Sequence, residues 1–133
     1  MNRMIFVNLP VTDLSAARTF YTGLGFSVNE QFSDAHCACI VISDTIFVML
    51  LEHGRFRDFI NGEISNAQAT TEVLNCLSAE SRQEVDELVA SALAGGGKPW
   101  KGRMEEGPMY GHSFADPDGH VWEVLFMEQS QQG

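Results

Sequence analysis

The sequence predicts an α+β fold in which two modules of the order strand–helix–strand–strand–strand follow each other along the chain. Runs of alternating apolar residues are typical of strands, and each set of runs is interrupted by one segment with apolar residues at helical spacing. The order repeats after residues 53–67, which lack a periodic apolar pattern. We expect the two βαβββ modules to pair into a curved sheet around a shared cavity, where a ligand pocket would form.

The chain has 133 residues, which suits one domain or two small halves sharing a core. The first module is predicted to span residues 1–52. Residues 3–9 alternate as a strand that Pro10 helps to end, and Asp13 is a suitable N-cap for the following helix. That helix is indicated by apolar residues at helical spacing and is stopped by glycine: Leu14, Ala17, Phe20, Tyr21, Leu24, Gly23 and Gly25. The remaining strands are predicted at 26–32, 36–43 and 46–52.

The second module is predicted to span residues 68–128, after a linker at 53–67 and before a polar tail at 129–133. In the linker, Phe56, Phe59 and Ile60 could form one helical turn. Ser81 and Glu84 have the spacing of a capping box at the start of a helix that a glycine run ends. Strands are predicted on both sides of this helix, at 69–78, 98–104, 109–115 and 120–127.

A turn and the strand after it, at 116–126, carry the clearest candidate for a functional residue. Asp116-Pro117-Asp118-Gly119 suits a type I turn. The strand that follows is apolar on both faces except at Glu123, so we expect it to be covered on both sides. A carboxylate in such a place needs a cation, a hydrogen-bond network or water in a cavity.

Composition restricts the classes of partner. The net charge of −10 argues against binding to nucleic-acid phosphate and to an anionic membrane surface. It allows a cationic ligand, although solubility is the simpler explanation. Three cysteines, no secretory segment and no apolar run of membrane-spanning length indicate a cytoplasmic protein with reduced thiols.

Three features together resemble the vicinal-oxygen-chelate superfamily, which includes glyoxalase I, extradiol dioxygenases, and bleomycin- and fosfomycin-resistance proteins. The first is Val11-Thr12-Asp13-Leu14 followed by Phe20-Tyr21 and Leu24-Gly25-Phe26. The second is the segment 116–123, DPDGHVWE, and the third is the doubled order of elements. Within this superfamily the chain is most similar to the bacterial branch of predicted lactoylglutathione lyases.

The resemblance implies where a metal site would lie, because the metal-dependent members take ligands from their first, fourth, fifth and eighth strands. Glu123 falls on the eighth-strand position, whereas Phe6, Leu50 and Leu74 fall on the others and cannot bind a metal. A shift of two residues gives Asn8, Glu52 and Glu72, an oxygen-rich set without the imidazole that zinc, nickel or ferrous iron favour. We therefore expect any divalent metal to be weakly bound or absent after purification, with Glu123 as its one named ligand.

The predicted site contains two kinds of residue. Glu123 and Glu72 are the candidate catalytic residues, because two carboxylates that meet raise one pKa and can act as an acid–base pair. The candidate ligand-binding residues are Phe6, Asn8, Leu50, Leu74, Tyr110 and His112. The alternative for Glu72 is a solvated strand end, and for Tyr110 and His112 a polar pair on an edge strand.

Two functions remain open on this sequence. One is a lyase or isomerase of the glyoxalase I type, acting on a small oxygenated substrate. The other is a metal-free protein that sequesters a small ligand, as the bleomycin-resistance members do. We also expect a homodimer, because small members of the superfamily commonly pair and because apolar edges are predicted near 46–51 and Trp100.

Overall fold

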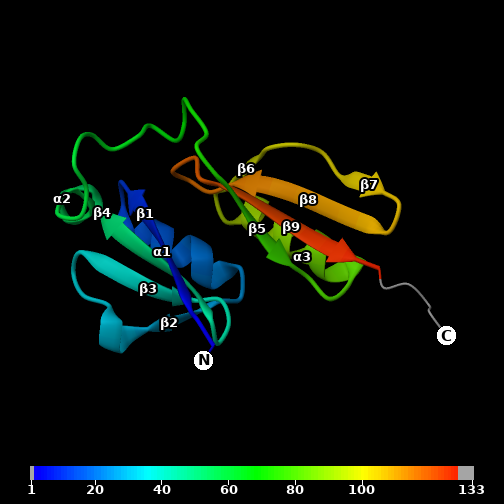
Figure 1. Ribbon diagram of the computed structural model, residues 1–133, viewed down its shortest axis with the longest axis horizontal. Coiled ribbons are helices and arrows are strands. Elements are labelled where there is room, and N and C mark those ends of the chain that lie inside the picture. Colours follow the sequence, from blue (N-terminus) through cyan, green and yellow to red (C-terminus); the bar gives the residue numbers. More distant parts are fainter. Residues whose placement is uncertain (1, 129–133) are drawn as a thin grey trace. The chain divides into compact units, whose positions relative to one another are not determined.

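The computed structural model describes residues 2–128, so the predicted tail at 129–133 lies outside the described residues. The chain divides into two compact units, Met1–Asn66 and Ala67–Gly133, and each is described by itself (Figure 1). Each unit contains one mixed sheet and one long helix, so the predicted α+β class and its two-module order are confirmed. The shared cavity stays a prediction.

The sheet of the first unit contains β1 (Ile5–Val11), β2 (Ser27–Asn29), β3 (Cys37–Val41) and β4 (Ile46–Glu52) in the order β1-β4-β3-β2. β1 runs parallel to β4 and the other pairs are antiparallel. The strand at 46–52 is therefore interior, and the prediction that it forms an apolar edge is wrong. β1 also continues through Pro10, because an edge strand tolerates a residue that cannot donate a hydrogen bond.

Helix α1 (Leu14–Gly23) covers one face of this sheet. Asp13 caps it as predicted, since the Asp13 carboxylate accepts a 3.0 Å hydrogen bond from the Ala16 amide. The helix contacts β3 and β4. On one face of the sheet Leu50, Val48 and Ile40 are fully buried, whereas Phe6 on the other face is 50% exposed. α1 therefore packs on the Leu50 face of the sheet.

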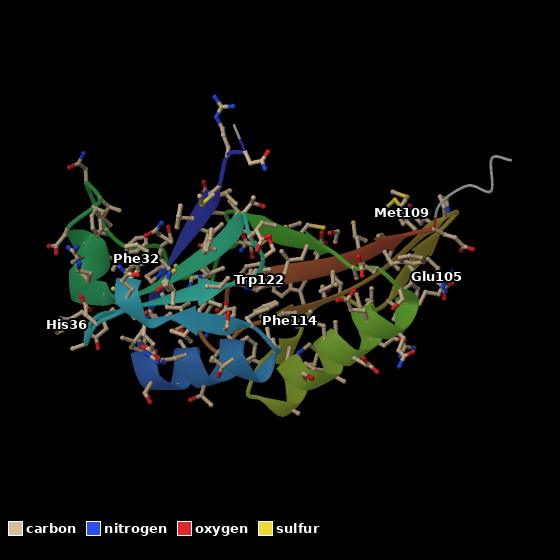
Figure 2. All side chains as sticks on the ribbon, turned by 90° about the horizontal axis from the view of Figure 1, so that it is seen from below. Phe32, His36, Glu105, Met109, Phe114 and Trp122 are labelled. Atoms are coloured by element: carbon tan, nitrogen blue, oxygen red, sulfur yellow. The ribbon has the colours of Figure 1, made fainter. Side chains whose placement is uncertain are left out.

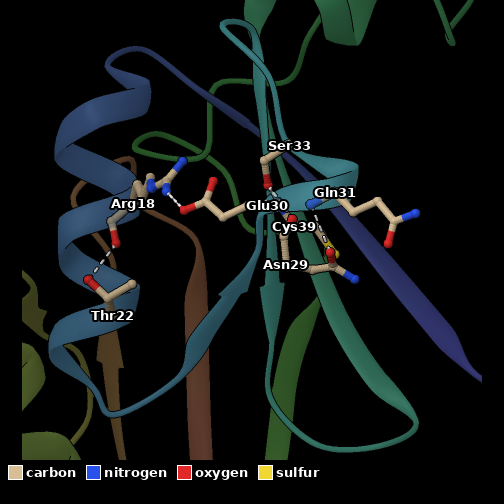
Figure 3. A network of polar contacts seen from close by, with 7 residues as sticks. All are labelled: Arg18, Thr22, Asn29, Glu30, Gln31, Ser33 and Cys39. Atoms are coloured by element: carbon tan, nitrogen blue, oxygen red, sulfur yellow. Dashed lines mark hydrogen bonds and ion pairs between the residues drawn. The ribbon is translucent and has the colours of Figure 1, made fainter.

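A short polar network ends β2 earlier than predicted (Figure 3). The predicted strand 26–32 gives way to a 3-10 helix, η1 (Glu30–Phe32), because the Asn29 side chain accepts a 3.0 Å hydrogen bond from the Gln31 amide. Ser33 then bridges the Asn29 carbonyl and the Cys39 amide at 2.7 and 3.0 Å. An ion pair between Arg18 and Glu30 ties η1 to α1.

The sheet of the second unit contains β5 (Leu74–Ser78), β9 (Val121–Met127), β8 (Met109–Ala115) and β6 (Lys98–Pro99), in that order, with β7 (Met104–Glu106) also paired to β8. The prediction of one strand at 98–104 is wrong, because β6 and β7 are separate. Between them, the Ser113 hydroxyl bonds the amide and the carbonyl of Lys101 at 3.0 and 3.1 Å, which occupies the backbone groups that a ladder would use. β5 is also shorter than the predicted strand 69–78.

Helix α3 (Arg82–Ala94) packs against β8 and β9. The capping box is present in a modified form. Ser81 accepts a 3.0 Å bond from the Glu84 amide, while the Glu84 carboxylate accepts from the Glu80 amide at 2.6 Å, one residue before the cap. The short helix α2 (His53–Arg57) lies within the predicted linker. No helix among residues 2–128 is both long and apolar enough to cross a membrane.

The turn before β9 is organised by the buried Asp116, which is 1% exposed. Its carboxylate oxygen Oδ1 accepts bonds from the amides of Asp118 and His120 at 3.0 and 2.8 Å. The Asp116 backbone also bonds His120 and Gly119, at 2.8 and 2.9 Å. Gly119 has a φ of 96°, which favours glycine, so the residue types predicted for this turn are those that its geometry requires.

Candidate functional site

Glu123 lies in the middle of β9, on the face of the second sheet that α3 does not cover. Across the two ladders its partners are Cys76 on β5 and Ser113 on β8. The neighbouring residues Trp122 and Val124 alternate to the other face and are buried there, and Trp122 pairs with Phe114 (Figure 2). The strand is thus apolar on its helix side, and Glu123 is the polar member of its open side.

A pocket of about 180 Å³ adjoins Glu123. Residues of the β6–β7 connection and of strands β7, β8 and β9 line it: Lys101, Gly102, Met104, Gly111, His112, Ser113, Glu123 and Leu125. Because the Ser113 hydroxyl holds the Lys101 backbone, the connection is fixed beside the strand position opposite Glu123. The pocket thus combines a carboxylate, a lysine and the apolar side chains of Met104 and Leu125.

The Glu123 carboxylate is half-buried and forms no hydrogen bond or ion pair with another described residue. Its neighbours do not neutralise it. Burial raises the pKa of the Cys76 thiol, and the negative charge of Glu123 raises it further, so this thiol stays protonated near neutral pH. The Ser113 hydroxyl is occupied by Lys101. The Glu123 carboxylate is therefore available to accept hydrogen bonds from a ligand.

The residues around Glu123 in this unit do not fit a divalent metal. Within residues 2–128, no three side chains of the types His, Cys, Asp and Glu come together as a metal site. Zinc and the related transition metals require three or four such donors. Among the described residues of its sheet, Glu123 has one protonated thiol beside it in the ladder, and the His112 imidazole belongs to the other face, so these side chains do not form a metal site.

Glu72 is exposed and lies before β5, which begins at Leu74. The register places Cys76, not Glu72, beside Glu123, so the sheet does not form the predicted carboxylate pair. Leu74 is 52% exposed and pairs with Val121, on the same face as Glu123. Of the two predicted catalytic residues, only Glu123 lines the pocket.

Tyr110 and His112 share a face as predicted, but it is the α3 face of β8, opposite Ser113. Tyr110 is 4% exposed, and its hydroxyl donates a 2.5 Å hydrogen bond to the Asp86 carboxylate on α3. The structure therefore places Tyr110 under the helix and away from Glu123. His112 adjoins the pocket, but it belongs to the face of β8 that includes Tyr110, opposite the face that Ser113 shares with Glu123.

A polar clamp joins α3 to β7 and β8, and sequence reasoning missed it. We define it as Arg82, Asp86, Arg103, Glu105 and Tyr110. Arg82 lies 4.7 Å from the Tyr110 ring centroid and 3.1 Å from a Glu105 oxygen, while Arg103 lies 3.5 Å from Asp86. Arg103 lies in the sequence between two pocket residues, Gly102 and Met104. Its ion pair with Asp86 therefore anchors to α3 the segment that forms one wall of the pocket. The i, i+4 spacing of Arg82 and Asp86 was the available signal.

The candidate residues of the first unit do not meet on one face. Phe6 and Asn8 lie on one face of β1, where the Phe6 ring stacks on Phe47 at a centroid distance of 4.8 Å. Leu50 is fully buried under α1, on the opposite face. Paired residues of two strands share a face, and successive residues of a strand alternate between faces. Because Phe6 pairs with Phe47 and Leu9 pairs with Leu50, Phe6 and Leu50 lie on opposite faces of the sheet. The structure thus gives Leu50 a role in packing.

A larger hollow of about 530 Å³ lies at the start of α1, beside Thr12, Asp13, Arg18 and Glu52. Its charged side chains already have partners. Asp13 caps the helix, Arg18 pairs with Glu30, and Glu52 bonds His36 at 2.8 Å. It offers no available acceptor comparable to Glu123.

Replacing Gly111 by alanine should shrink the pocket. A Cβ at this position would lie 2.4 Å from Leu125 Cδ2 and 3.3 Å from the Val124 carbonyl oxygen, so the Leu125 side chain in the pocket lining must move. We expect a loss of about 1–3 kcal/mol in the free energy of unfolding, as for overpacking. Urea unfolding measures this loss. Gly102→Ala is the matched control in the same wall, because nothing lies within 4 Å of its Cβ position; equal losses would contradict the prediction.

His112 should make the protein less stable in mild acid. Burial lowers the pKa of His112 below 6.5, and the Arg103 charge lowers it further against an opposing effect of Asp86. In the unfolded chain His112 is protonated near pH 6.5, whereas in the folded protein it is protonated only at lower pH. The free energy of unfolding therefore falls as the pH drops from 6.5 toward the lower pKa of the folded protein.

Urea unfolding at about pH 7.5 and pH 5.5 tests this expectation, with the histidine reference near pH 6.5 between them. Wild type should lose more stability on acidification than His112→Gln, and equal losses would refute the prediction. His36 is an internal reference in NMR titration. Its pKa is raised by the hydrogen bond to Glu52 and by the Glu52 charge, so the two histidines should titrate on opposite sides of 6.5.

Comparison with known proteins gives matches of two kinds. The family model described as bleomycin resistance protein-like N-terminal matches residues 3–43. No curated protein matches the chain. Among solved structures, a hypothetical protein from S. aureus is similar with a TM-score of 0.80 and 29% identity, covering 95% of both chains.

Two further structures carry family names. A glyoxalase/bleomycin resistance protein/dioxygenase family enzyme from Burkholderia phytofirmans has a TM-score of 0.78 at 20% identity, covering 95% of this chain and 99% of its own. Lactoylglutathione lyase from Agrobacterium tumefaciens has a TM-score of 0.68 at 19% identity, covering 95% of this chain and 94% of its own. At these identities the likeness shows the fold, which is that of glyoxalase-type proteins with two modules.

The family model thus matches the N-terminal part of the chain, and the solved structures share its fold. This agrees with the resemblance carried by the residues 11–14, 20–26 and 116–123.

Proposed function

We propose that the protein binds a small organic molecule in the pocket beside Glu123 and sequesters it without a metal. The observation that carries this proposal is the available carboxylate of Glu123 at the wall of a pocket with apolar sides. A folded protein that leaves a half-buried carboxylate without a partner gains when a ligand or ordered water completes its hydrogen bonds. The bleomycin-resistance-like match at residues 3–43 supports the same class of function.

The donor set supports the metal-free form of this function. A glyoxalase-type metal site takes side chains from several strands, whereas Phe6, Leu50 and Leu74 supply none. Protein purified without added metal should contain zinc, nickel and iron far below one atom per chain. Elemental analysis measures this content directly, and one tightly held metal atom per chain would refute the metal-free proposal.

The substitution Glu123→Gln tests the site, because it keeps the shape of the side chain and removes the charge. A small-molecule library screened by NMR against isotope-labelled protein should give hits that shift resonances of Met104 and Leu125. Those hits should weaken in Glu123→Gln by more than the roughly 1 kcal/mol of a neutral hydrogen bond. Glu128→Gln, which removes the same charge just beyond β9, is the control and should bind as wild type does. Hits confined to other surfaces would refute the proposal.

A second candidate is a lyase or isomerase of the glyoxalase I type. The likeness to the A. tumefaciens lactoylglutathione lyase favours it, and the Glu123 carboxylate in the pocket lining is the group proposed to move a proton from a bound substrate. Formation of lactoylglutathione from methylglyoxal and glutathione, with and without added divalent metal, separates the two candidates. Turnover that Glu123→Gln abolishes would support the enzyme and overturn simple sequestration.

We also propose that the chain forms a homodimer in the cytoplasm. The exposed side chains of Met4, Ile5 and Phe6 at the edge strand β1 support an interface, and the free thiols of all three cysteines suit a reducing compartment. Sedimentation at micromolar concentration should give about twice the chain mass of 14.7 kDa. A mass near that of one chain would contradict the dimer.

A further inference from the structure

The available carboxylate of Glu123 restricts the chemistry of the molecule that can occupy its pocket. An ionised carboxylate only accepts hydrogen bonds. A ligand atom that contacts it must therefore donate, and a positively charged donor bonds about twice as strongly as a neutral one. An anionic ligand would instead be repelled at close range in a half-buried site.

The two residues that flank Glu123 on the neighbouring strands carry no positive charge. Cys76 stands directly beside Glu123 in the sheet and is neutral as a thiol, while Ser113 on the other side is occupied by the Lys101 backbone. Lys101 carries the pocket's one cationic side chain. It is exposed and forms no ion pair with Glu123 within the described part of the chain.

The remaining walls suit an apolar body. Met104 and Leu125 line the pocket, and the Leu125 methyl Cδ2 packs closely over Gly111, 2.4 Å from where a Cβ would lie. A thioether on three rotatable bonds adapts to ligands of different shape. The volume of about 180 Å³ equals roughly six water molecules at about 30 Å³ each, which fits an organic group of several heavy atoms.

We propose that the pocket binds a small organic cation, with an ammonium group on the Glu123 carboxylate and an alkyl or aryl body against Met104 and Leu125. This inference rests on the proposed function and names its ligand class. The net charge of −10 acts in the same direction, because it raises the local concentration of cations. The positive charge of Lys101 in the same pocket lining repels a cationic ligand, so its removal should strengthen binding.

The test uses three probes with one carbon skeleton and different charge: butylammonium, butanol and butyrate. Each is titrated into the full-length protein labelled at methionine methyl groups, and the shift of the Met104 methyl reports occupancy. Butylammonium should bind most tightly and weaken as salt rises. Glu123→Gln should lower its affinity roughly tenfold or more, which is the loss expected for a charge-assisted bond. Lys101→Met should raise its affinity, and Glu128→Gln should leave it unchanged.

The outcomes separate the inference from the function on which it rests. Binding of butanol or butyrate at the Met104 methyl, as tight as that of butylammonium, would overturn the cation and leave small-molecule binding intact. Butyrate binding that Lys101→Met abolishes would assign the site to anions. Absence of any shift for all three probes and for the wider library would overturn both. Normal unfolding curves for the variants ensure that a lost shift reports on the pocket.

Discussion

Replacing Asp116 by alanine should destabilise the second unit by about 2–5 kcal/mol, the range for leaving buried backbone donors without partners. The carboxylate of this 1% exposed residue accepts the amides of Asp118 and His120, and alanine would remove both bonds at once. No neighbouring water can replace the acceptor easily at a buried position. Urea unfolding followed by the fluorescence of Trp122, which is buried in the adjacent strand, measures the loss.

Asp116→Asn is the matched control. Its amide oxygen can accept the same two amides, so we expect it to retain more than half of the stability that alanine loses. If Asp116→Ala unfolds within about 0.5 kcal/mol of wild type, the range of an ordinary surface substitution, the carboxylate does not organise the turn.

Gly119→Ala should be almost as damaging, because two independent costs combine there. The φ of 96° is a region that side-chain-bearing residues rarely adopt. A Cβ would also lie 2.9 Å from backbone atoms of Ala67 and Gln68, which cannot move aside as the end of a side chain can. We expect a loss of about 2–4 kcal/mol, combining backbone strain with overpacking.

Gly107→Ala separates these two costs. Gly107 also has a positive φ, of 58°, but nothing lies within 4 Å of its Cβ position. It should therefore lose about 1–2 kcal/mol, the cost of the left-handed backbone alone. Equal losses in the two variants, measured by thermal unfolding, would mean that the approach to Ala67 and Gln68 adds nothing.

The features that could be predicted from the sequence are set by neighbours in the chain. Asp13 and Ser81 begin helices because a side-chain oxygen reaches an amide three residues later. The turn at 116–119 depends on the bonds of Asp116 and the conformation of Gly119, both within five residues. The prominence of Glu123 follows from the apolar alternation around it. Such signals depend on no distant part of the chain.

The relations that could not be predicted are between distant segments. Alternation correctly put Tyr110 and His112 on one face, but only the packing of α3 decides that this face is covered. Cys76 rather than Glu72 stands beside Glu123 because the parallel register of β5 and β9 fixes which residues pair. The break between β6 and β7 likewise depends on the hydroxyl of Ser113, twelve residues from Lys101.

The parallel strand pairs have a consequence for synthesis on the ribosome. β5 is an edge strand whose one sheet partner is β9, the last strand of the chain. The Gln68 side chain reaches the Pro117 carbonyl at 3.0 Å, across a separation of 49 residues. A nascent chain that has not yet released residues 116–127 therefore leaves β5 without a strand to pair with, beside Val73 and Leu74, which are exposed apolar side chains even in the folded chain. A pause or premature stop shortly before Val121 would leave an open strand edge at which nascent chains associate with one another.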